Sequence, residues 1–301
     1  MKNITVVMST FNGSKCVVRQ LNSIFNQKDV FVTCLVRDDG STDSTLDILN
    51  SYVPSKGKLI ITKGENVGWE HSFMLALKES PDNDYYAFAD QDDVWFADKL
   101  INGIKKIDEF TENDVAIMYH CNKISVTEDM KPLFHQVKRT AIPLNRQNAM
   151  VQEYAQGCSI IMNKKAKQLV TSYLPQKRIA HDFWCGLICY LFGNVIYDNI
   201  PQFYHISYGN NASGEGHLIG SWLSRFKSFF SGNTVYYMPY SDLEEGFKRR
   251  LTDSDLEFLY RVKTYKKSLK NKLSLLFSIN FVRDSFMGTC SLKLAILLNK
   301  L

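Results

Sequence analysis

The chain has 301 residues, of which 45% are hydrophobic and 22% are charged, and these ordinary proportions exclude a disordered tail, a fibrous repeat and a disulfide-stapled miniprotein. At roughly 150 residues per domain, this length indicates one large domain or two modest ones. The net charge of +5 is unevenly distributed, because residues 221–301 include 14 basic and 7 acidic residues whereas residues 1–220 include 22 basic and 24 acidic residues. The basic tail favours a polyanionic surface, of lipid or nucleic acid, as its partner.

The seven cysteines are scattered, odd in number and without a CxxC pair. This pattern argues against a disulfide framework and a zinc ribbon, and it fits a reducing cytoplasm. The first residues lack the long apolar run of a signal peptide, and no stretch offers the about 20 mostly apolar residues that a membrane span needs. We therefore expect a cytoplasmic protein without a transmembrane helix.

The first hundred residues alternate between predicted strands and helices, which is the pattern of a parallel α/β sheet. Strands are expected at 4–8, 31–36, 59–62 and 85–89, and helices around 17–25, 45–52 and 72–78. Polar loops follow the strands, at the edge where open α/β sheets bind ligands. Beyond residue 100 we expect strands at 115–119, 159–162, 195–197 and 203–206, a helix at 182–192, and mostly helix from 221 onward. The glycine-rich turn 209–220 is the candidate boundary.

Three carboxylates follow the fourth predicted strand, in Asp90-Gln91-Asp92-Asp93. Packed carboxylates repel one another unless a cation or hydrogen-bond donors relieve them. A hard divalent ion with oxygen ligands is the usual relief, and it would neutralise a bound diphosphate. The alternative is a solvated turn in which Asp93 caps the next helix. The motif alone favours neither.

Two further loops could contact a nucleotide. In Asp38-Asp39-Gly40-Ser41, the Asp39 carboxylate could accept a hydrogen bond from the N3–H of a pyrimidine, although a helix-capping Asp-Gly turn is the commoner use. The loop from Asn66 to Gly68 could bring backbone N–H groups to a phosphate, with an ordinary turn as the alternative.

His181 and Asp182 precede an apolar run. Asp182 could act as a general base on an attacking hydroxyl, or it could cap the following helix. His181 alone is more often a packing histidine, and Cys158 is better interpreted as a buried thiol than as a nucleophile. The sequence contains no P-loop, no GxGxxG after the first strand, no HExxH and no GxSxG, which removes the corresponding enzyme classes.

The motifs in this order closely resemble the family-2 glycosyltransferases of the GT-A fold, and within them a bacterial rhamnosyltransferase-like branch. They are Ser9-Thr10-Phe11-Asn12, Val36-Arg37-Asp38-Asp39-Gly40-Ser41, Asn66-Val67-Gly68, Asp90-Gln91-Asp92-Asp93-Val94-Trp95, Gln156-Gly157-Cys158, His181-Asp182 with Trp184, and Tyr208-Gly209-Asn210-Asn211. The resemblance covers 4–214. It implies an α/β catalytic domain at 1–220, with a mostly parallel sheet flanked by helices, followed by a helical, basic extension at 221–301.

The resemblance also implies a role for each matched residue. The nucleotide would contact Thr10, Asn12, Asp39, Asn66, Gly68, Asp90 and Asp92. Mg²⁺ or Mn²⁺ would bind Asp92 or Asp93. Gly157, Cys158, His181 and Trp184 would shape the acceptor side. Asp182 would deprotonate the acceptor hydroxyl in a single displacement that inverts the anomeric carbon.

The chain departs from the family pattern at one metal position. Relatives often have a Tyr-Arg-x-His-Gly-Asn-Asn run whose histidine completes the metal site. Here Tyr208 stands in that place and His205 lies three residues earlier, which makes His205 the candidate third ligand.

The implied donor is dTDP-L-rhamnose, with UDP-galactose and UDP-glucose as alternatives. The implied acceptor is a lipid-linked glycan of capsule or O-antigen synthesis, met at the inner face of the cell membrane. A sugar-nucleotide nucleotidyltransferase and an inactive nucleotide-binding scaffold are the competing classes, and nucleic-acid binding ranks below them because the strand-end loops are acidic. Apolar and basic residues of the tail favour either contact with an anionic membrane or packing of a helical subdomain on the core. The apolar ones are Trp222, Phe226, Phe229 and Phe230.

Overall fold

The computed structural model describes residues 1–110, 114–133, 141–208 and 238–301. The chain forms two compact units. The sheet unit comprises 1–141, 155–174 and 178–208, and the helical unit comprises 142–154, 175–177 and 209–301. The expected boundary turn and the four aromatic residues of the tail at 222–230 lie outside the described residues, so the boundary between catalytic domain and extension stays a prediction.

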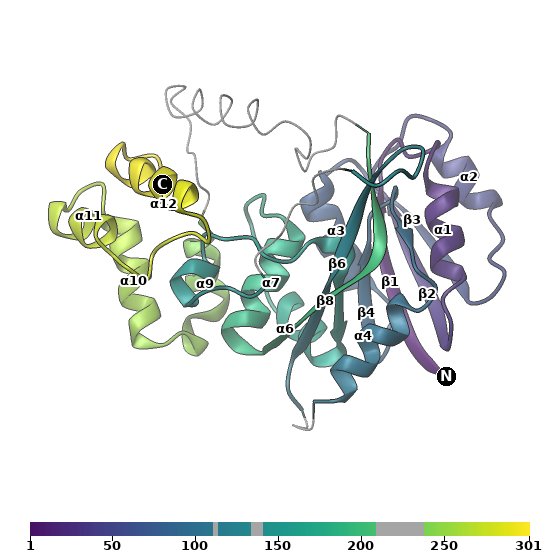
Figure 1. Ribbon diagram of the computed structural model, residues 1–301, viewed down its shortest axis with the longest axis horizontal. Helices are drawn as coiled ribbons and strands as arrows, with labels where there is room; N and C mark the ends of the chain where they lie inside the picture. Colours follow the sequence, from purple (N-terminus) through teal and green to yellow (C-terminus); the bar gives the residue numbers. More distant parts are fainter. Residues whose placement is uncertain (111–113, 134–140, 209–237) are drawn as a thin grey trace. The chain divides into compact units, whose positions relative to one another are not determined.

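The sheet unit is built on one eight-stranded mixed sheet in the order β3-β2-β1-β4-β7-β6-β8-β5 (Figure 1). The strands are β1 (Lys2–Thr10), β2 (Val30–Asp38), β3 (Lys58–Lys63), β4 (Tyr85–Ala89), β5 (Val94–Trp95), β6 (Ile117–Thr127), β7 (Ile160–Asn163) and β8 (Asn194–Ser207). The first four strands pair in parallel, β7 runs antiparallel to β4 and β6, and β8 pairs in parallel with β6. The predicted α/β class is therefore confirmed.

Helices cover both faces of this sheet, because its strands are apolar on both sides. On one side lie α1 (Val17–Phe25), α2 (Thr45–Ser51) and α4 (Lys99–Asp108), whose apolar residues form one core with β1 and β2. On the other lie α3 (Trp69–Glu79), α6 (Lys164–Thr171) and α7 (His181–Phe192) (Figure 1). This arrangement leaves the carboxyl ends of β1, β2 and β4 free to form a site.

The expectation of two short strands near the end of the sheet unit was wrong. Residues 195–197 and 203–206 belong to one strand, β8, which pairs with β6 along its length. The apolar pattern breaks at the exposed Asn199 and Ile200 before Pro201, and there the pairing shifts register instead of ending. A bulge of this kind keeps a strand continuous while bending it.

The helical unit has its own small core, which includes Phe258, Leu259, Phe281 and Leu292. The elements described in this unit are α5 (Arg146–Ala149), α9 (Tyr240–Phe247), α10 (Asp253–Thr264), α11 (Leu269–Leu276) and α12 (Phe286–Leu297), with a short 3₁₀ turn at Lys248–Arg250. A capping box at Thr252 begins α10. The predicted helical character of the tail holds from residue 238 onward. Among the described residues, no helix has the length and apolar character needed to cross a membrane.

Candidate active site

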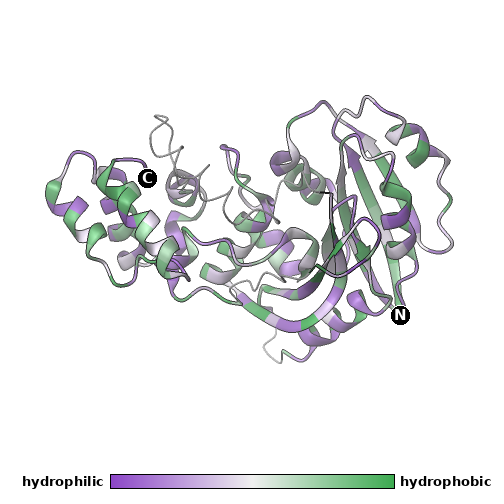
Figure 2. Ribbon diagram, turned by 45° about the horizontal axis from the view of Figure 1, so that its top comes forward, coloured by the Kyte–Doolittle hydropathy of each residue, from purple (hydrophilic) through white to green (hydrophobic). Residues whose placement is uncertain are grey.

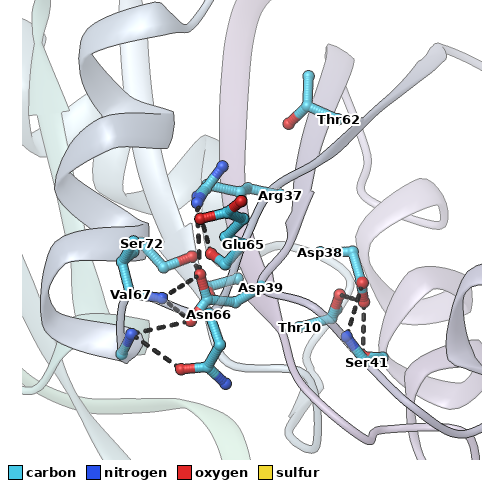
Figure 3. Close-up of polar contacts among 12 residues, drawn as sticks. Thr10, Arg37, Asp38, Asp39, Ser41, Thr62, Glu65, Asn66, Val67 and Ser72 are labelled. Atoms are coloured by element: carbon cyan, nitrogen blue, oxygen red, sulfur yellow. Dashed lines mark hydrogen bonds and ion pairs between the residues drawn. The ribbon is translucent and has the colours of Figure 1, made fainter.

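The loop after β2 is anchored to the end of β1 by a buried carboxylate. Oδ2 of Asp38 accepts hydrogen bonds from Oγ1 of Thr10 at 3.0 Å and from Oγ of Ser41 at 2.6 Å, and Oδ1 accepts one from the Ser41 N–H at 2.9 Å (Figure 3). Thr10 and Asp38 are fully buried. Thr10, predicted at the nucleotide, therefore positions this loop through Asp38.

Asp39 holds the loop that follows β3. One carboxylate oxygen accepts the Gly68 N–H at 3.0 Å, both lie 3.2 Å from the Val67 N–H, and Nη2 of Arg37 lies 3.4 Å from Oδ1 (Figure 3). Asn66 helps by accepting the Gly68 N–H on its own side-chain oxygen at 3.2 Å. Gly68 has a φ of 85°, a conformation that favours glycine. The loop from Asn66 to Gly68, which was predicted to contact a phosphate, is thus held in place by Asp39, which was predicted to contact the base.

Gln91 links the end of β1 to the acidic motif. Its Oε1 accepts the Phe11 N–H at 3.0 Å, and its Nε2 donates to the Phe11 carbonyl at 3.2 Å. Asn12 turns the chain with a φ of 50° and accepts the Thr42 N–H at 2.8 Å. The predicted nucleotide residues therefore lie on loops that are hydrogen-bonded to one another.

The three carboxylates of the acidic motif have different surroundings. Burial and the charges of Asp93 and Asp92 raise the pKa of Asp90 to about 8, and burial together with Asp93 raises the pKa of Asp92 to about 6. Asp93 is fully buried. Charge crowding of this kind is relieved by a bound cation.

Asp93, Cys158 and His205 form a buried cluster whose ligand atoms lie within 4.8 Å of one another. Nδ1 of His205 is 2.9 Å from Oδ1 of Asp93, whereas Oδ2 of Asp93 is buried and has no hydrogen-bond partner among the residues that the structure describes. The carboxylate oxygen suits Mg²⁺ or Mn²⁺, whereas an imidazole and a thiol are ligands of softer divalent ions such as Zn²⁺. Two of the three candidate metal ligands, Asp93 and His205, are thus in contact, and the thiol of Cys158 lies beside them.

Asp182 lies in the first turn of α7 and is buried. Its Oδ1 accepts the Phe183 N–H at 2.8 Å, and its Oδ2 accepts the Gly157 N–H at 3.1 Å. The second bond joins the predicted base to the turn predicted to shape the acceptor side. Among the described residues, these two backbone donors orient the carboxylate, and a carboxylate has about four lone-pair positions in all.

His181 is a packing residue on the neighbouring wall. Its ring stacks on Phe73 with centroids 4.0 Å apart and meets Phe88 edge-on at 4.7 Å. Burial lowers its pKa to about 3, so the ring is neutral at physiological pH. A Cβ built on Gly157 would overlap Nε2 of this ring, which explains the glycine. Cys158 and Trp184 are fully buried. If they contribute to the acceptor side, they do so by packing beneath it and not by contacting the acceptor.

Sequence reasoning missed three supporting residues. Arg37 donates to the Glu65 carbonyl at 3.2 Å as well as contacting Asp39, and Gln91 forms the link described above. Lys99 is fully buried, with Nζ 3.7 Å from the centre of the Trp95 ring, and burial lowers its pKa. Arg37 and Gln91 lie within two of the motifs that carry the family resemblance, so their place in these motifs could have identified them. Nothing in the pattern distinguished Lys99 from a surface lysine.

The sequence profile of Glycosyl transferase family 2 matches residues 5–170, which is more than half of the chain. The chain belongs to this family. The match runs from β1 to the end of α6 and includes the acidic motif and the Gly157–Cys158 turn. Asp182 and His205 lie beyond it, so their predicted roles rest on position and geometry.

Individual proteins that are similar to this chain are also glycosyltransferases by name. The chain is 35% identical over 102 residues to the dTDP-rhamnosyl transferase RfbG of Shigella flexneri, covering 32% of this chain and 35% of RfbG. It is 28% identical over 116 residues to the UDP-Glc:alpha-D-GlcNAc-diphosphoundecaprenol beta-1,3-glucosyltransferase WfgD of Escherichia coli, covering 38% and 44%. The chain thus spans less than half the length of these curated relatives.

The fold is similar to that of S. aureus TarS. In the TarS 1–349 structure with UDP-GlcNAc, the TM-score is 0.56 at 17% identity, and the match covers 93% of this chain and 77% of that one. The structure with UDP gives 0.55 over the same share of this chain and 76% of that one. This similarity confirms the predicted GT-A type fold.

Proposed function

We propose that the protein is an inverting glycosyltransferase that moves a sugar from a nucleoside-diphosphate donor to a hydroxyl group of an acceptor. The observation on which this depends is the Asp182 carboxylate, oriented by the backbone N–H groups of Gly157 and Phe183. The sheet unit that contains it also presents the crowded carboxylates after β4. A positioned base and an acidic, cation-binding loop are the two parts that a single displacement at a sugar phosphate needs.

Asp182 would accept the proton of the acceptor hydroxyl group. The oxygen of that hydroxyl group would attack the anomeric carbon of the donor sugar as the bond between this carbon and the diphosphate breaks. The hydrogen bonds from Gly157 and Phe183 hold the carboxylate in place for this transfer. We propose that Asp92, Asp93 and His205 hold Mg²⁺ or Mn²⁺. Oδ2 of Asp93, which is buried and has no hydrogen-bond partner in the described part of the chain, fits such an ion. When bound, the ion would neutralise charge on the leaving diphosphate.

We propose dTDP-L-rhamnose as the donor, a choice supported by the similarity to RfbG. UDP-glucose and UDP-galactose are the alternatives, since the relative WfgD is named as a UDP-Glc-dependent glucosyltransferase. The name of WfgD also includes a diphosphoundecaprenol-linked sugar, which supports a lipid-linked glycan of bacterial surface polysaccharide as the acceptor. Such an acceptor would be met at the inner face of the cell membrane.

A donor screen tests this proposal. Purified protein with Mn²⁺ is incubated with dTDP-rhamnose, UDP-glucose, UDP-galactose or UDP-N-acetylglucosamine and with a membrane extract, and the released nucleoside diphosphate is measured. We expect release from one donor, abolished by EDTA and by Asp182→Asn. The matched control is Asp47→Asn, because Asp47 occupies the first turn of α2 as Asp182 does that of α7, and this variant should retain activity.

Two added measurements distinguish the competing classes, an incubation with a nucleoside triphosphate and a sugar phosphate and a thermal-shift assay. A sugar-nucleotide nucleotidyltransferase would form pyrophosphate from a nucleoside triphosphate and a sugar phosphate. An inactive scaffold would show a thermal shift with UDP or dTDP and no release from any donor. Full activity of Asp182→Asn would contradict the assignment of the base.

A further inference from the structure

The last helix, α12, has an outward face without any charged residue. Its exposed positions are Phe286, Met287, Cys290, Leu294 and Leu297, followed by Leu298 just after the helix. At 3.6 residues per turn they fall within an arc of about 120°. The opposite side, with Leu292, Ala295 and Ile296, packs into the helical unit.

The one charged side chain of α12 points inward. Nζ of Lys293 donates to the carbonyls of Leu275 at 2.8 Å and Ser278 at 2.9 Å. A helix that is apolar all round is normally buried on every side. Here the described residues of the helical unit cover one side of α12, and Phe286 remains 81% exposed.

The neighbouring α11 continues this apolar face. Leu269, Leu273 and Phe277 recur every fourth residue and are exposed, and Ile279 follows in the connection to α12. Phe277 is 76% and Ile279 86% exposed. The two helices are joined by the bond from Nζ of Lys272 to the Leu297 carbonyl at 2.7 Å. In Figure 2 the helices next to the C-terminus show stretches in the colour of hydrophobic residues, interrupted by hydrophilic ones.

The segment that contains this apolar face is rich in basic residues. From residue 258 to 301 the chain contains nine lysines and arginines and one acidic residue, Asp284. Lys266, Lys267 and Lys270 are exposed on and just before α11. On a second copy of the chain the same face would bring like charges together, which disfavours self-association. Anionic lipid offers both an apolar interior and a negative surface.

We propose that the α11–α12 face, formed by Leu269, Leu273, Phe277, Ile279, Phe286, Met287, Leu294 and Leu297, is a docking surface for an anionic membrane. The aromatic and aliphatic side chains insert below the headgroups, and the lysines contact lipid phosphates. The 12 residues of α12 are too few to span a bilayer, which needs about 20, so the helix lies in the interface. This deepens the proposed function by placing a membrane contact on named residues, and it differs from the aromatic segment at 222–230 expected from the sequence.

Vesicle flotation tests this surface without any sugar donor. The full chain is mixed with vesicles of phosphatidylcholine alone or with one quarter phosphatidylglycerol. We expect binding to the anionic vesicles and a loss of at least about tenfold in partitioning for the triple variant Phe277→Ser, Ile279→Ser, Phe286→Ser, since each removes a large apolar contact. Replacing Lys266 and Lys270 by Gln should weaken binding about fivefold per lysine.

The control variant replaces two equally exposed apolar residues of the sheet unit, Val53→Ser and Ile200→Ser, which are 85% and 63% exposed. It should bind as the wild type does. The proposal is overturned if the wild type ignores anionic vesicles, or if the triple variant binds them equally well. It is also overturned if light scattering shows a dimer that the triple variant breaks, because a second copy then covers the face. Since no glycosyl transfer is measured, failure here leaves the proposed reaction untouched.

Discussion

Replacing Asp39 by Asn separates two roles of this residue, holding a loop and recognising a base. The carboxylate has three donors, the N–H groups of Val67 and Gly68 and Nη2 of Arg37. An amide offers one acceptor oxygen, so its NH₂ group must face at least one of these donors. Hydrogen bonds to a buried charge contribute about 1.5–3 kcal/mol each. Loss of one therefore predicts a decrease of about 2 kcal/mol in the free energy of unfolding, which corresponds to a melting temperature lower by about 4–8 °C.

Urea unfolding followed by tryptophan fluorescence measures the stability, and calorimetric titration measures UDP, dTDP, CDP and ADP binding. If Asp39 recognises the N3–H of a pyrimidine, Asp39→Asn loses the preference for UDP over CDP. If it only holds the loop, all affinities fall together. The control is Asp38→Asn, which removes an equally buried set of hydrogen bonds from Thr10 and Ser41 and should keep the base preference. A stability of Asp39→Asn within about 0.5 kcal/mol of the wild type would refute the account of the loop.

Four further predictions concern the turn beside the base, the acidic motif and the helical unit. Gly157→Ala should lower kcat at least about tenfold, because its Cβ overlaps His181 and displaces the N–H that orients the base; unchanged single-turnover rates would contradict this. The pKa values of Asp90 near 8 and Asp92 near 6 predict that Mg²⁺ affinity in calorimetry rises from pH 6 to pH 8, as protons leave. Because these folded-state values exceed the ordinary 3.8, the stability that the two carboxyl groups contribute to the metal-free protein should fall as pH rises from about 4 to 8. The lowered pKa values of His120 and His181 act in the opposite sense, so the check is the difference in melting temperature between the wild type and Asp90→Asn, and a difference that does not change with pH would argue against this account. Thr252→Ala removes the cap of α10 and should cost about 1 kcal/mol in urea unfolding, while Thr62→Ala should cost less.

The parallel half of the fold and the order of its loops could be predicted from hydrophobic alternation, because strands β1 to β4 are short, apolar and followed at once by polar turns. The family resemblance came from the same loops. What could not be predicted was which side chains meet across long separations. Asp93 and His205 are 112 residues apart in the chain, and their contact depends on β8 being one strand.

The local partners of the predicted residues were also hidden in the sequence. Asp39 was expected to face a base, and its hydrogen bonds to Val67 and Gly68 depend on the approach of a loop 28 residues away. Likewise, the thiol of Cys158 was interpreted as a buried residue, which it is, but its position beside the Asp93 carboxylate follows from the pairing of β4 with β7.

The pairing of β8 has a consequence for how the protein forms during synthesis. Strand β5, next to the acidic motif, pairs with β8, and the long β6 pairs with β8 along one edge and with the short β7 on the other. The ribosome must therefore release residue 207 before β5 is paired and before both edges of β6 are covered. A nascent chain that ends with α6 would contain the whole acidic motif yet leave the edge of β6 open to other chains. Such late, non-local pairing is slow and exposes the intermediate to aggregation. The site would therefore be assembled near the end of folding, and fragments limited to the first 170 residues should precipitate more readily than the full chain.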